Sequence, residues 1–515
     1  MTVGQTDIPL ETTRTHDASS LRRMLVTLPT LVMVLVYLWA AAHTAKVRLL
    51  RPWTQSPWES EIVMDAWRVV HHQPVYTDSA LDHATHMYGP LGTYIVAPFI
   101  KEYGADPRIP RFIALLAALM LCVLMSVTLS RRSGSLWLTA GMIFALGYLQ
   151  FYRIREWATE ARPDATAILC GFIAIAAFYR SAGAARLRNV WIWSTLGAVA
   201  TLVTFFFKQP VAMVALLPPL MLAFNQKREI ARRIAPAVLP LAALAGAIAL
   251  LKLLAPWVYH YMADVPGMYP VSLGTWFLAL LELLRFNTLF IATLFAWIAL
   301  RSRSEQRDPI DRWLIATILI SGLVSSAARA KFGGYFNSLL PTYLAMSVFV
   351  ARKLPALFRS VASKNPLGVV LFAGLPALLL LADIVAPAGG RTLNPGAIAL
   401  QHGDASFTTI IKTAKSLPGK FVSPDDPLIA LNAKAYAGRC GECELDAVGR
   451  NSTEFPLPQY MLDELRDADW VLQVSAARPS TIPDDTLSKM GFQKTSGIIP
   501  GSAVYTLWKH ASPSI

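Results

Sequence analysis

Long apolar stretches repeat along this chain, and they constrain its fold more than any other feature. Only 16% of the 515 residues are charged, whereas a soluble protein of this size carries about 25%. A helix needs about 20 apolar residues to cross a bilayer. Runs that meet or approach this length begin near Met24, Arg111, Ser135, Asp164, Asn189, Pro210, Ile234, Leu273, Trp313, Tyr335 and Gly368. We therefore predict an all-α polytopic membrane protein with about 11 transmembrane helices.

The apolar runs divide the chain into a tail, a membrane domain and a C-terminal region. Residues 1–23 are polar and are predicted to form a cytoplasmic tail. The first run is too long for a signal-peptide core and lacks a convincing cleavage site, so we expect a retained helix. Residues 24–387 form the predicted transmembrane domain, which includes a first extracytoplasmic loop at 46–108. The run from Tyr88 to Ile100 is too short to span and is expected to be interfacial or re-entrant.

Residues 388–515 are long enough to bury a core of their own. Helix-like segments, SFTTIIKTAKSL and QYMLDELRDA, alternate with strand-like ones, PLIALNA, DWVLQVSA and SAVYTLW. This pattern predicts a small extracytoplasmic α/β domain.

The placement of Lys and Arg gives the predicted membrane domain an orientation. With the N-terminus inside, the inside loops hold seventeen basic residues, and the short outside loops hold six. Cytoplasmic loops carry such an excess in membrane proteins. The same loops explain the net charge of +14. No Lys/Arg stripe is interleaved with aromatic residues in a polar region, so nucleic acid is not an expected partner.

The four cysteines predict no zinc ribbon. Cys122 and Cys170 lie in apolar runs and are expected to be inert. Cys440 and Cys443 form a single CGEC, and a zinc ribbon needs a second such pair. A local disulfide or two free thiols is the expectation.

Acidic residues in the first outside loop are the first candidates for chemistry. Glu59, Glu61 and Asp65 lie in or just before a predicted amphipathic helix. Glu61 and Asp65 are four residues apart and could share a face, whereas Glu59 would sit near the helix start, where the dipole favours a carboxylate. Solvated helix charges are the alternative for each residue.

Basic residues on the outside of the membrane are the second group of candidates. Arg153, Arg155 and Arg162 oppose the positive-inside bias, and they either meet an anionic ligand or pair with Glu156 and Glu160. Asp164 follows Arg162-Pro163 and could simply cap a helix. Further polar residues at outside helix ends are Lys208, Gln209, Arg329, Lys331, Tyr335 and Asn337. Glu282 with Arg285, three residues apart in an apolar run, is a paired intramembrane charge that is either functional or a structural ion pair.

These polar groups share the outer membrane face. Cations there can neutralise a leaving phosphate, and a carboxylate can take the proton of an acceptor hydroxyl. Apolar helices would hold a lipid tail attached to that phosphate. The pattern therefore favours transfer from a phosphate-linked lipid donor.

The order of the motifs over residues 20–390 resembles that of the GT-C glycosyltransferases, which include protein O-mannosyltransferases and lipid A aminoarabinose transferases. The family's acidic pair, Pro-x-Tyr segment and Tyr-x-Pro-Leu segment look like Glu59 with Glu61, Pro74 with Tyr76, and Tyr88 to Leu91. Its Arg-Pro-Asp motif looks like Arg162 to Asp164, and its late aromatic-polar segment looks like Tyr335 to Pro341. Two positions depart: Trp58-Glu59 stands where many members have Asp-Glu, and His71-His72 replaces the usual Gly.

The resemblance implies inverting sugar transfer from a polyprenyl-phosphate donor to a glycan, lipid or protein acceptor. It places the protein in a bacterial inner membrane with the active site and C-terminal domain facing the periplasm. By it, Glu59 is the first choice for the base, Glu61 its substitute, and Asp164 a supporting carboxylate. Donor phosphate would be bound by Arg162, Lys208 and Lys331, then by Arg153, Arg155 and Arg329, with Tyr88, Tyr335 and Asn337 as further substrate contacts.

Three matters stay open. No cofactor is certain, but a divalent metal is compatible with Glu59, Glu61 and Asp164, which are hard oxygen ligands. A transporter or flippase of a lipid-linked sugar is the main alternative, although we detect no inverted repeat of the kind many transporters have. A non-catalytic receptor, with the tail binding a partner, is the second.

Overall fold

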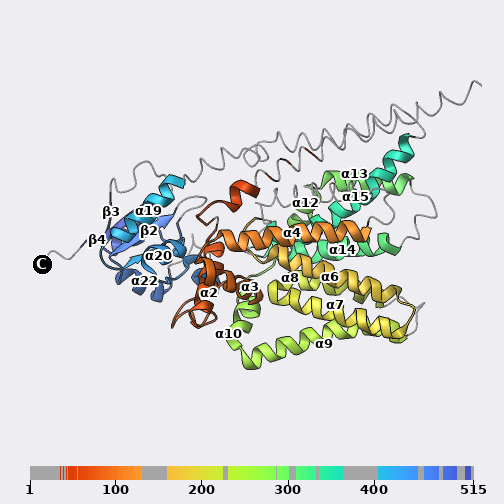
Figure 1. The fold of residues 1–515 in the computed structure, drawn as a ribbon, viewed down its shortest axis with the longest axis horizontal. Helices are drawn as coiled ribbons and strands as arrows, with labels where there is room; N and C mark the ends of the chain where they lie inside the picture. Colours follow the sequence, from red (N-terminus) through yellow and green to blue (C-terminus); the bar gives the residue numbers. More distant parts are fainter. Residues whose placement is uncertain are drawn as a thin grey trace, which may run out of the picture.

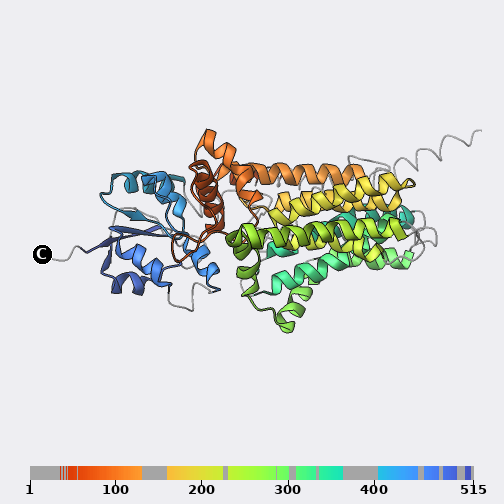
Figure 2. The same ribbon diagram turned by 90° about the horizontal axis from the view of Figure 1, so that it is seen from below.

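The structure is a computed structural model. It describes residues 45–54, 56–129, 159–223, 230–285, 287–300, 309–331, 336–362, 404–449, 457–474, 480–495 and 505–511, with Leu35, Trp39, Ala42 and Gly334. The molecule is elongated. A bundle of lengthwise helices forms one end and a small sheet-containing domain forms the other, and short helices lie between them (Figures 1 and 2).

The described bundle follows the predicted apolar runs. Five helices are long and apolar enough to cross a membrane, and the bent pair α12–α13 makes a sixth if it counts as one span. The bundle helices are α4 (Arg108–Leu129), α6 (Asp164–Gly183), α7 (Leu187–Phe207), α8 (Gln209–Ala223), α9 (Ile230–Leu254), α12 (Leu273–Arg285), α13 (Thr288–Leu300), α14 (Pro309–Ala330) and α15 (Leu340–Ala362). The runs beginning near Met24, Ser135 and Gly368 fall mostly or wholly outside the described residues, so the count of eleven stays a prediction.

Helix α4 shows how these sequences produce a bundle. Its buried residues are spaced i, i+3, i+4 and i+7, which is one face of a helix, and they join an apolar cluster with α6 and α15: Ala114, Ala117, Ala118 and Leu121. Large apolar side chains on other faces stay exposed, among them Phe112, Leu116 and Val123. Such a surface suits contact with lipid tails, which need no polar partner.

Short helices form the layer between the bundle and the C-terminal domain. They are α2 (Pro57–Val70), α3 (Leu91–Tyr103), α10 (Pro256–Tyr259), the π-helix η2 (His260–Asp264) and α11 (Val265–Gly267). Pro57 begins α2, a position where its missing N–H costs nothing. Helix α3 has 13 residues, too few to span a bilayer, as expected for the run at 88–100.

The C-terminal region contains a four-stranded sheet in the order β1-β2-β4-β3. Strand β1 is parallel to β2, and the other pairings are antiparallel. The strands are β1 (Phe421–Val422), β2 (Trp470–Val474), β3 (Phe492–Lys494) and β4 (Tyr505–His510). The helices are α19 (Asp404–Ser416), α20 (Pro427–Lys434), α21 (Gly441–Ala447), α22 (Gln459–Arg466) and α23 (Asp484–Lys489).

Alternation along β2 gives the sheet two buried faces. Trp470 and Leu472 pack with residues of α19 and α20, while Val471, which points to the other side, packs with residues of α22. The strand prediction for PLIALNA is wrong, because these residues form α20. A short apolar run of this kind cannot be assigned from periodicity alone, and Pro427 supplies a helix start.

Candidate functional site

A group of buried polar side chains lies where the bundle meets the intermediate layer. We call it the Asp164 cluster, and its members are Tyr88, Glu160, Arg162, Asp164, Lys208 and Asn337. Five of these six were predicted as site residues, and they come from segments far apart in the chain. The prediction that they gather around one place is therefore supported for Tyr88, Arg162, Asp164, Lys208 and Asn337.

The Asp164 carboxylate is the centre of this cluster. Its Oδ1 atom accepts hydrogen bonds from Lys208 Nζ and from Asn337 Nδ2, the latter at 3.2 Å. Its buried Oδ2 atom has no hydrogen-bond donor among the described residues. Asp164 is the first residue of α6, and no side-chain hydrogen bond caps that helix. The alternative that Asp164 serves as a helix cap is therefore not what the structure shows.

Arg162 links the two sides of the cluster. It donates from Nη1 to the Tyr88 hydroxyl at 2.9 Å and from Nε to Glu160 Oε1 at 2.9 Å. Its guanidinium lies 4.5 Å from the Trp58 ring centroid. Burial raises the pKa of Glu160 and lowers that of Lys208, the second effect being opposed by Asp164. Both groups are consequently sensitive to any charge that enters the cluster.

A broken helix places Lys208 in the cluster. Pro210 has no N–H to donate to the Phe206 carbonyl, so the α7 pattern cannot continue past it. Helix α7 ends at Phe207, Lys208 is extended, and α8 begins at the next residue. The Phe206 carbonyl meets Gly89, where an added Cβ would lie 2.1 Å from the oxygen. This close approach holds the Tyr88 segment beside Lys208, whose Nζ is 5.2 Å from the Tyr88 ring centroid.

Two further predicted cations have other partners. Lys331 donates to the Pro266 carbonyl at 2.8 Å, and burial lowers its pKa. Arg329 donates to the Gly334 carbonyl at 2.9 Å and forms an ion pair with Glu282, with 3.2 Å between Nε and Oε2. Glu282 thus has an ion-pair partner on another helix. The predicted residues Arg153, Arg155 and Tyr335 lie outside the described part of the chain.

Glu59, the first choice for the base, is fully buried and occupied. Arg111 donates to its two oxygens at 2.8 and 2.5 Å, and the Ala161 N–H donates to Oε1 at 2.7 Å. Arg111 is itself fully buried and also donates to backbone carbonyls before α2, including that of Trp53 at 2.6 Å. This arrangement is suited to fixing the loop rather than to accepting a further proton.

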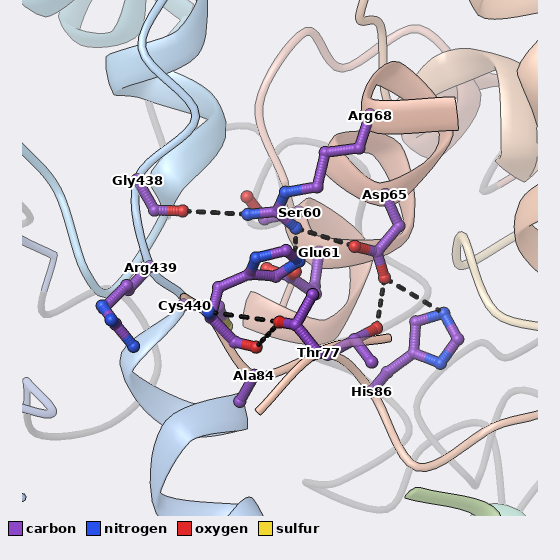
Figure 3. A network of polar contacts seen from close by, with 12 residues as sticks. Ser60, Glu61, Asp65, Arg68, Thr77, Ala84, His86, Gly438, Arg439 and Cys440 are labelled. Atoms are coloured by element: carbon purple, nitrogen blue, oxygen red, sulfur yellow. Dashed lines mark hydrogen bonds and ion pairs between the residues drawn. The ribbon is translucent and has the colours of Figure 1, made fainter. Parts of the chain in front are cut away.

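Glu61 and Asp65 share one face of α2, as predicted, and both bind Arg68. Arg68 Nη1 lies 2.6 Å from Glu61 Oε1 and 2.7 Å from Asp65 Oδ1, and Nη2 donates to the Gly438 carbonyl at 3.2 Å (Figure 3). Burial raises the pKa of Glu61 to about 7. His86 Nε2 lies 3.6 Å from Asp65 Oδ2. Arg68 and His86 were missed, although Arg68 stands one turn after Asp65.

The expected oxygen ligands of a divalent metal are not gathered together. Among the described residues, the His, Cys, Asp and Glu side chains whose ligand atoms converge are Glu61, Cys440 and Cys443, all within 4.8 Å of one another. Glu59 and Asp164 belong to separate groups with their own basic partners.

An apolar cavity of about 130 Å³ opens between α4, α6, α8, α14 and α15. Three of its lining residues follow members of the Asp164 cluster by about one helical turn: Ile168 follows Asp164, Val211 follows Lys208, and Pro341 follows Asn337. Its walls are almost entirely apolar and include Ile168, Phe172, Val211, Trp313, Pro341 and Leu344.

No family model and no curated protein matches this sequence. Solved structures do. The crystal structure of ArnT from Cupriavidus metallidurans bound to undecaprenyl phosphate aligns with a TM-score of 0.58 and 12% identity over 93% of this chain and 98% of that one. Its apo form gives a TM-score of 0.57 at the same identity and coverage.

The chain has the GT-C fold. The fold predicted from motif order is thereby confirmed, and with it the assignment to integral membrane proteins. The Archaeoglobus fulgidus oligosaccharyltransferase in complex with Zn and sulfate is also similar, with a TM-score of 0.45 and 12% identity over 85% of this chain and 68% of that one. At these identities the likeness concerns the fold, so the roles of GT-C residues in this chain must come from its own geometry.

Proposed function

We propose that this protein is a membrane glycosyltransferase that moves a sugar from a polyprenyl-phosphate donor to an acceptor on the extracytoplasmic face. The observation that carries the proposal is the Asp164 cluster, in which buried cations lie with a partly unsatisfied carboxylate, and Asp164 and Lys208 stand one helical turn before residues that line an apolar cavity. The ArnT structure with the same fold holds undecaprenyl phosphate, which supports a lipid phosphate as the donor here.

Arg162 and Lys208 are the proposed ligands of the donor phosphate. Their present partners, Glu160 and Asp164, balance their charges in a buried setting. A phosphate entering the cluster would form charge-assisted hydrogen bonds with both cations and would be stabilised more strongly there than in water. Lys331 is a third proposed contact with the donor phosphate. Arg153, Arg155 and Arg329 are lower-ranked candidates for the same role.

We reassign the base from Glu59 to Asp164. Glu59 already accepts three hydrogen bonds, whereas Asp164 Oδ2 has no donor among the described residues. In the proposed step, Asp164 takes the acceptor's hydroxyl proton while that oxygen attacks the anomeric carbon of the sugar. The bond from that carbon to the phosphate oxygen breaks with inversion, and the lipid phosphate leaves with its charge stabilised by Arg162 and Lys208. Glu61 is held by Arg68 and takes no part in this step.

The apolar cavity is the proposed seat of the first part of the prenyl chain. Val211 and Ile168 line it directly after the two segments that contribute Lys208 and Asp164. A phosphate held in the cluster would therefore direct its attached chain between the helices. The acceptor is a glycan, lipid or protein on the periplasmic side of a bacterial inner membrane, where the C-terminal domain would also lie.

The test is transfer by the full chain in detergent from synthetic undecaprenyl-phosphate sugars, with cell-envelope extract as acceptor. Asp164→Asn should lower the transfer rate by about 100-fold or more. Lys208→Met should chiefly weaken donor binding. Exposed residues supply matched controls, Asp467→Asn and Lys101→Met, which should transfer normally.

Two results would contradict the proposal. Full transfer by Asp164→Asn would remove the base assignment. Donor lipid that crosses the bilayer of reconstituted vesicles without losing its sugar would point to the transporter alternative.

A further inference from the structure

The interface between α2 and the C-terminal domain contains a buried trio that the proposed reaction does not use. Glu61 comes from α2, while Cys440 precedes α21 and Cys443 lies in its first turn. All three side chains are fully buried. Their ligand atoms lie within 4.8 Å of one another, and both cysteines are free thiols.

We propose that Glu61, Cys440 and Cys443 bind a structural zinc ion. Two thiolates spaced C-x-x-C are typical zinc ligands, and a carboxylate oxygen is also accepted by zinc. The thiolate pair disfavours magnesium and calcium, which prefer oxygen ligands alone. The missing second cysteine pair, which argued against a zinc ribbon, is replaced here by a carboxylate from a segment almost 380 residues earlier.

One oxygen of the Glu61 carboxylate is available to a metal ion, and the other is held by a hydrogen bond. Its Oε1 atom is held by Arg68 at 2.6 Å. Its Oε2 atom is buried and has no hydrogen-bond donor among the described residues. Figure 3 shows Glu61 beside Cys440, with Arg68 on the side away from the sulfur. Outer contacts of this kind orient metal ligands and keep them deprotonated.

We assign the fourth position to His83. Its Nδ1 atom lies 3.2 Å from Asp82 Oδ1, which is the contact that a zinc-binding histidine commonly makes through its second nitrogen. Its Nε2 atom is buried and has no hydrogen-bond partner among the described residues. Glu61 and His83 are close enough for each to influence the charge of the other. His83 is not among the side chains whose ligand atoms all lie within 4.8 Å of one another, so its ring would have to turn inward to complete a tetrahedral site.

Zinc binding would leave the net charge of this site unchanged, because the ion replaces two protons. Burial raises the pKa of both thiols, so without a metal they hold their protons. Zinc would displace those protons, and the remaining negative charge would face Arg68. The ion would tie α2 to the C-terminal domain, alongside the hydrogen bond from Ser60 to Asp426 at 2.8 Å. This inference does not depend on the proposed sugar transfer.

The test uses the full chain in detergent with Cys122→Ala and Cys170→Ala, which leaves Cys440 and Cys443 as the sole thiols. After removal of metal with a chelator under reducing conditions, zinc should rebind at one ion per chain and raise the thermal midpoint. Cobalt(II) in place of zinc should give a sulfur-to-metal charge-transfer absorption. Adding Cys440→Ser and Cys443→Ser should abolish both effects, and His83→Ala should weaken zinc binding by at least about tenfold.

Three outcomes would overturn the proposal. These are a cobalt spectrum without the charge-transfer band, zinc binding that survives loss of both cysteines, and intact mass spectrometry of freshly purified protein that shows a Cys440–Cys443 disulfide and no zinc. The cobalt spectrum is recorded on the variant that keeps Cys440 and Cys443. The test therefore holds even if the variant that lacks all four cysteines does not fold.

Discussion

In the layer between the bundle and the C-terminal domain, buried carboxylates form ion pairs with buried arginines. The Glu59–Arg111 pair has no exposed surface on either side chain. Removing one partner of such a pair leaves a charge without compensation in a low-dielectric interior, which is more costly than the pair itself is stabilising.

Glu59→Gln should therefore act on stability first. We expect a loss of about 3–5 kcal/mol in unfolding free energy, visible as a lower thermal midpoint in detergent, with sugar transfer lost in proportion to folded protein. Glu102→Gln, an exposed carboxylate at the end of α3, is the control. A folded Glu59→Gln protein of normal thermal midpoint with no transfer would return the base role to Glu59.

Burial of Asp426 predicts the sign of a pH dependence at this interface. Burial raises its pKa from 3.8 to about 6, against hydrogen bonds from Thr54 and Ser60. The folded chain therefore holds this proton more tightly than the unfolded chain, so its stabilising effect is complete below pH 3.8 and is lost as pH rises through 6.

The matching experiment compares thermal midpoints at pH 4.5 and 7.5. The natural chain should lose about 2 kcal/mol from this group over that interval. Asp426→Asn cannot titrate and should show a correspondingly smaller change. Equal pH dependence in the two proteins would contradict the assignment.

Single residues could be nominated from the sequence, but their partners could not. Asp164, Arg162 and Lys208 stood out because charge at an outside helix end is unusual. The bond between Glu59 and Arg111 joins residues 52 positions apart, and no local spacing rule reaches that far. The pairing of Glu61 with Cys440 and Cys443 depends on how two separately folded parts dock, which neither segment encodes alone.

At the scale of elements, the break between α7 and α8 determines the site. It exposes the Phe206 carbonyl to Gly89 and leaves Lys208 outside both helices. Gly89→Ala should clash with that carbonyl, displace Tyr88 and destabilise the protein by about 1–3 kcal/mol, with weaker donor binding.

Gly246→Ala in α9 is the matched control for Gly89→Ala. Nothing lies within 4 Å of an added Cβ there, so this change should be neutral or slightly stabilising. Equal thermal midpoints and equal donor affinity for the two variants would refute the proposed contact.

The long apolar runs were predicted as helices with the least ambiguity, and one short segment was assigned wrongly although other short ones were correct. The runs that form α4, α6, α7, α9 and α14 are long and apolar enough to cross a bilayer. Such a segment must be helical, because a helix satisfies its own backbone hydrogen bonds there. PLIALNA, with seven residues, became a helix because a buried strand and a buried helix look alike at that length.

At the scale of the whole molecule, the first turn of α6, which begins with Asp164, lies toward the C-terminal domain, and the turn between α6 and α7 lies at the far end of the bundle (Figure 1). The positive-inside pattern predicts that this turn is cytoplasmic. An impermeant maleimide applied to intact spheroplasts should label Ser416→Cys but not Gly183→Cys.

Both labelling positions are exposed, so access to the reagent depends on the membrane alone. Permeabilised cells, in which both variants should react, provide the control. Labelling of Gly183→Cys in intact spheroplasts would contradict the predicted orientation, and with it the proposal that the site faces the periplasm.

The contacts of Asp426 with Ser60 and of Arg68 with Gly438 join α2 to the C-terminal region of the chain. During synthesis, α2 is made long before the residues that bury its carboxylates. Its charged face must therefore wait in water while the later helices enter the membrane, and it closes only after the final domain arrives. Closure of this interface would then depend on synthesis and folding of the C-terminal region, so a chain released early would remain open there however well its helices had inserted.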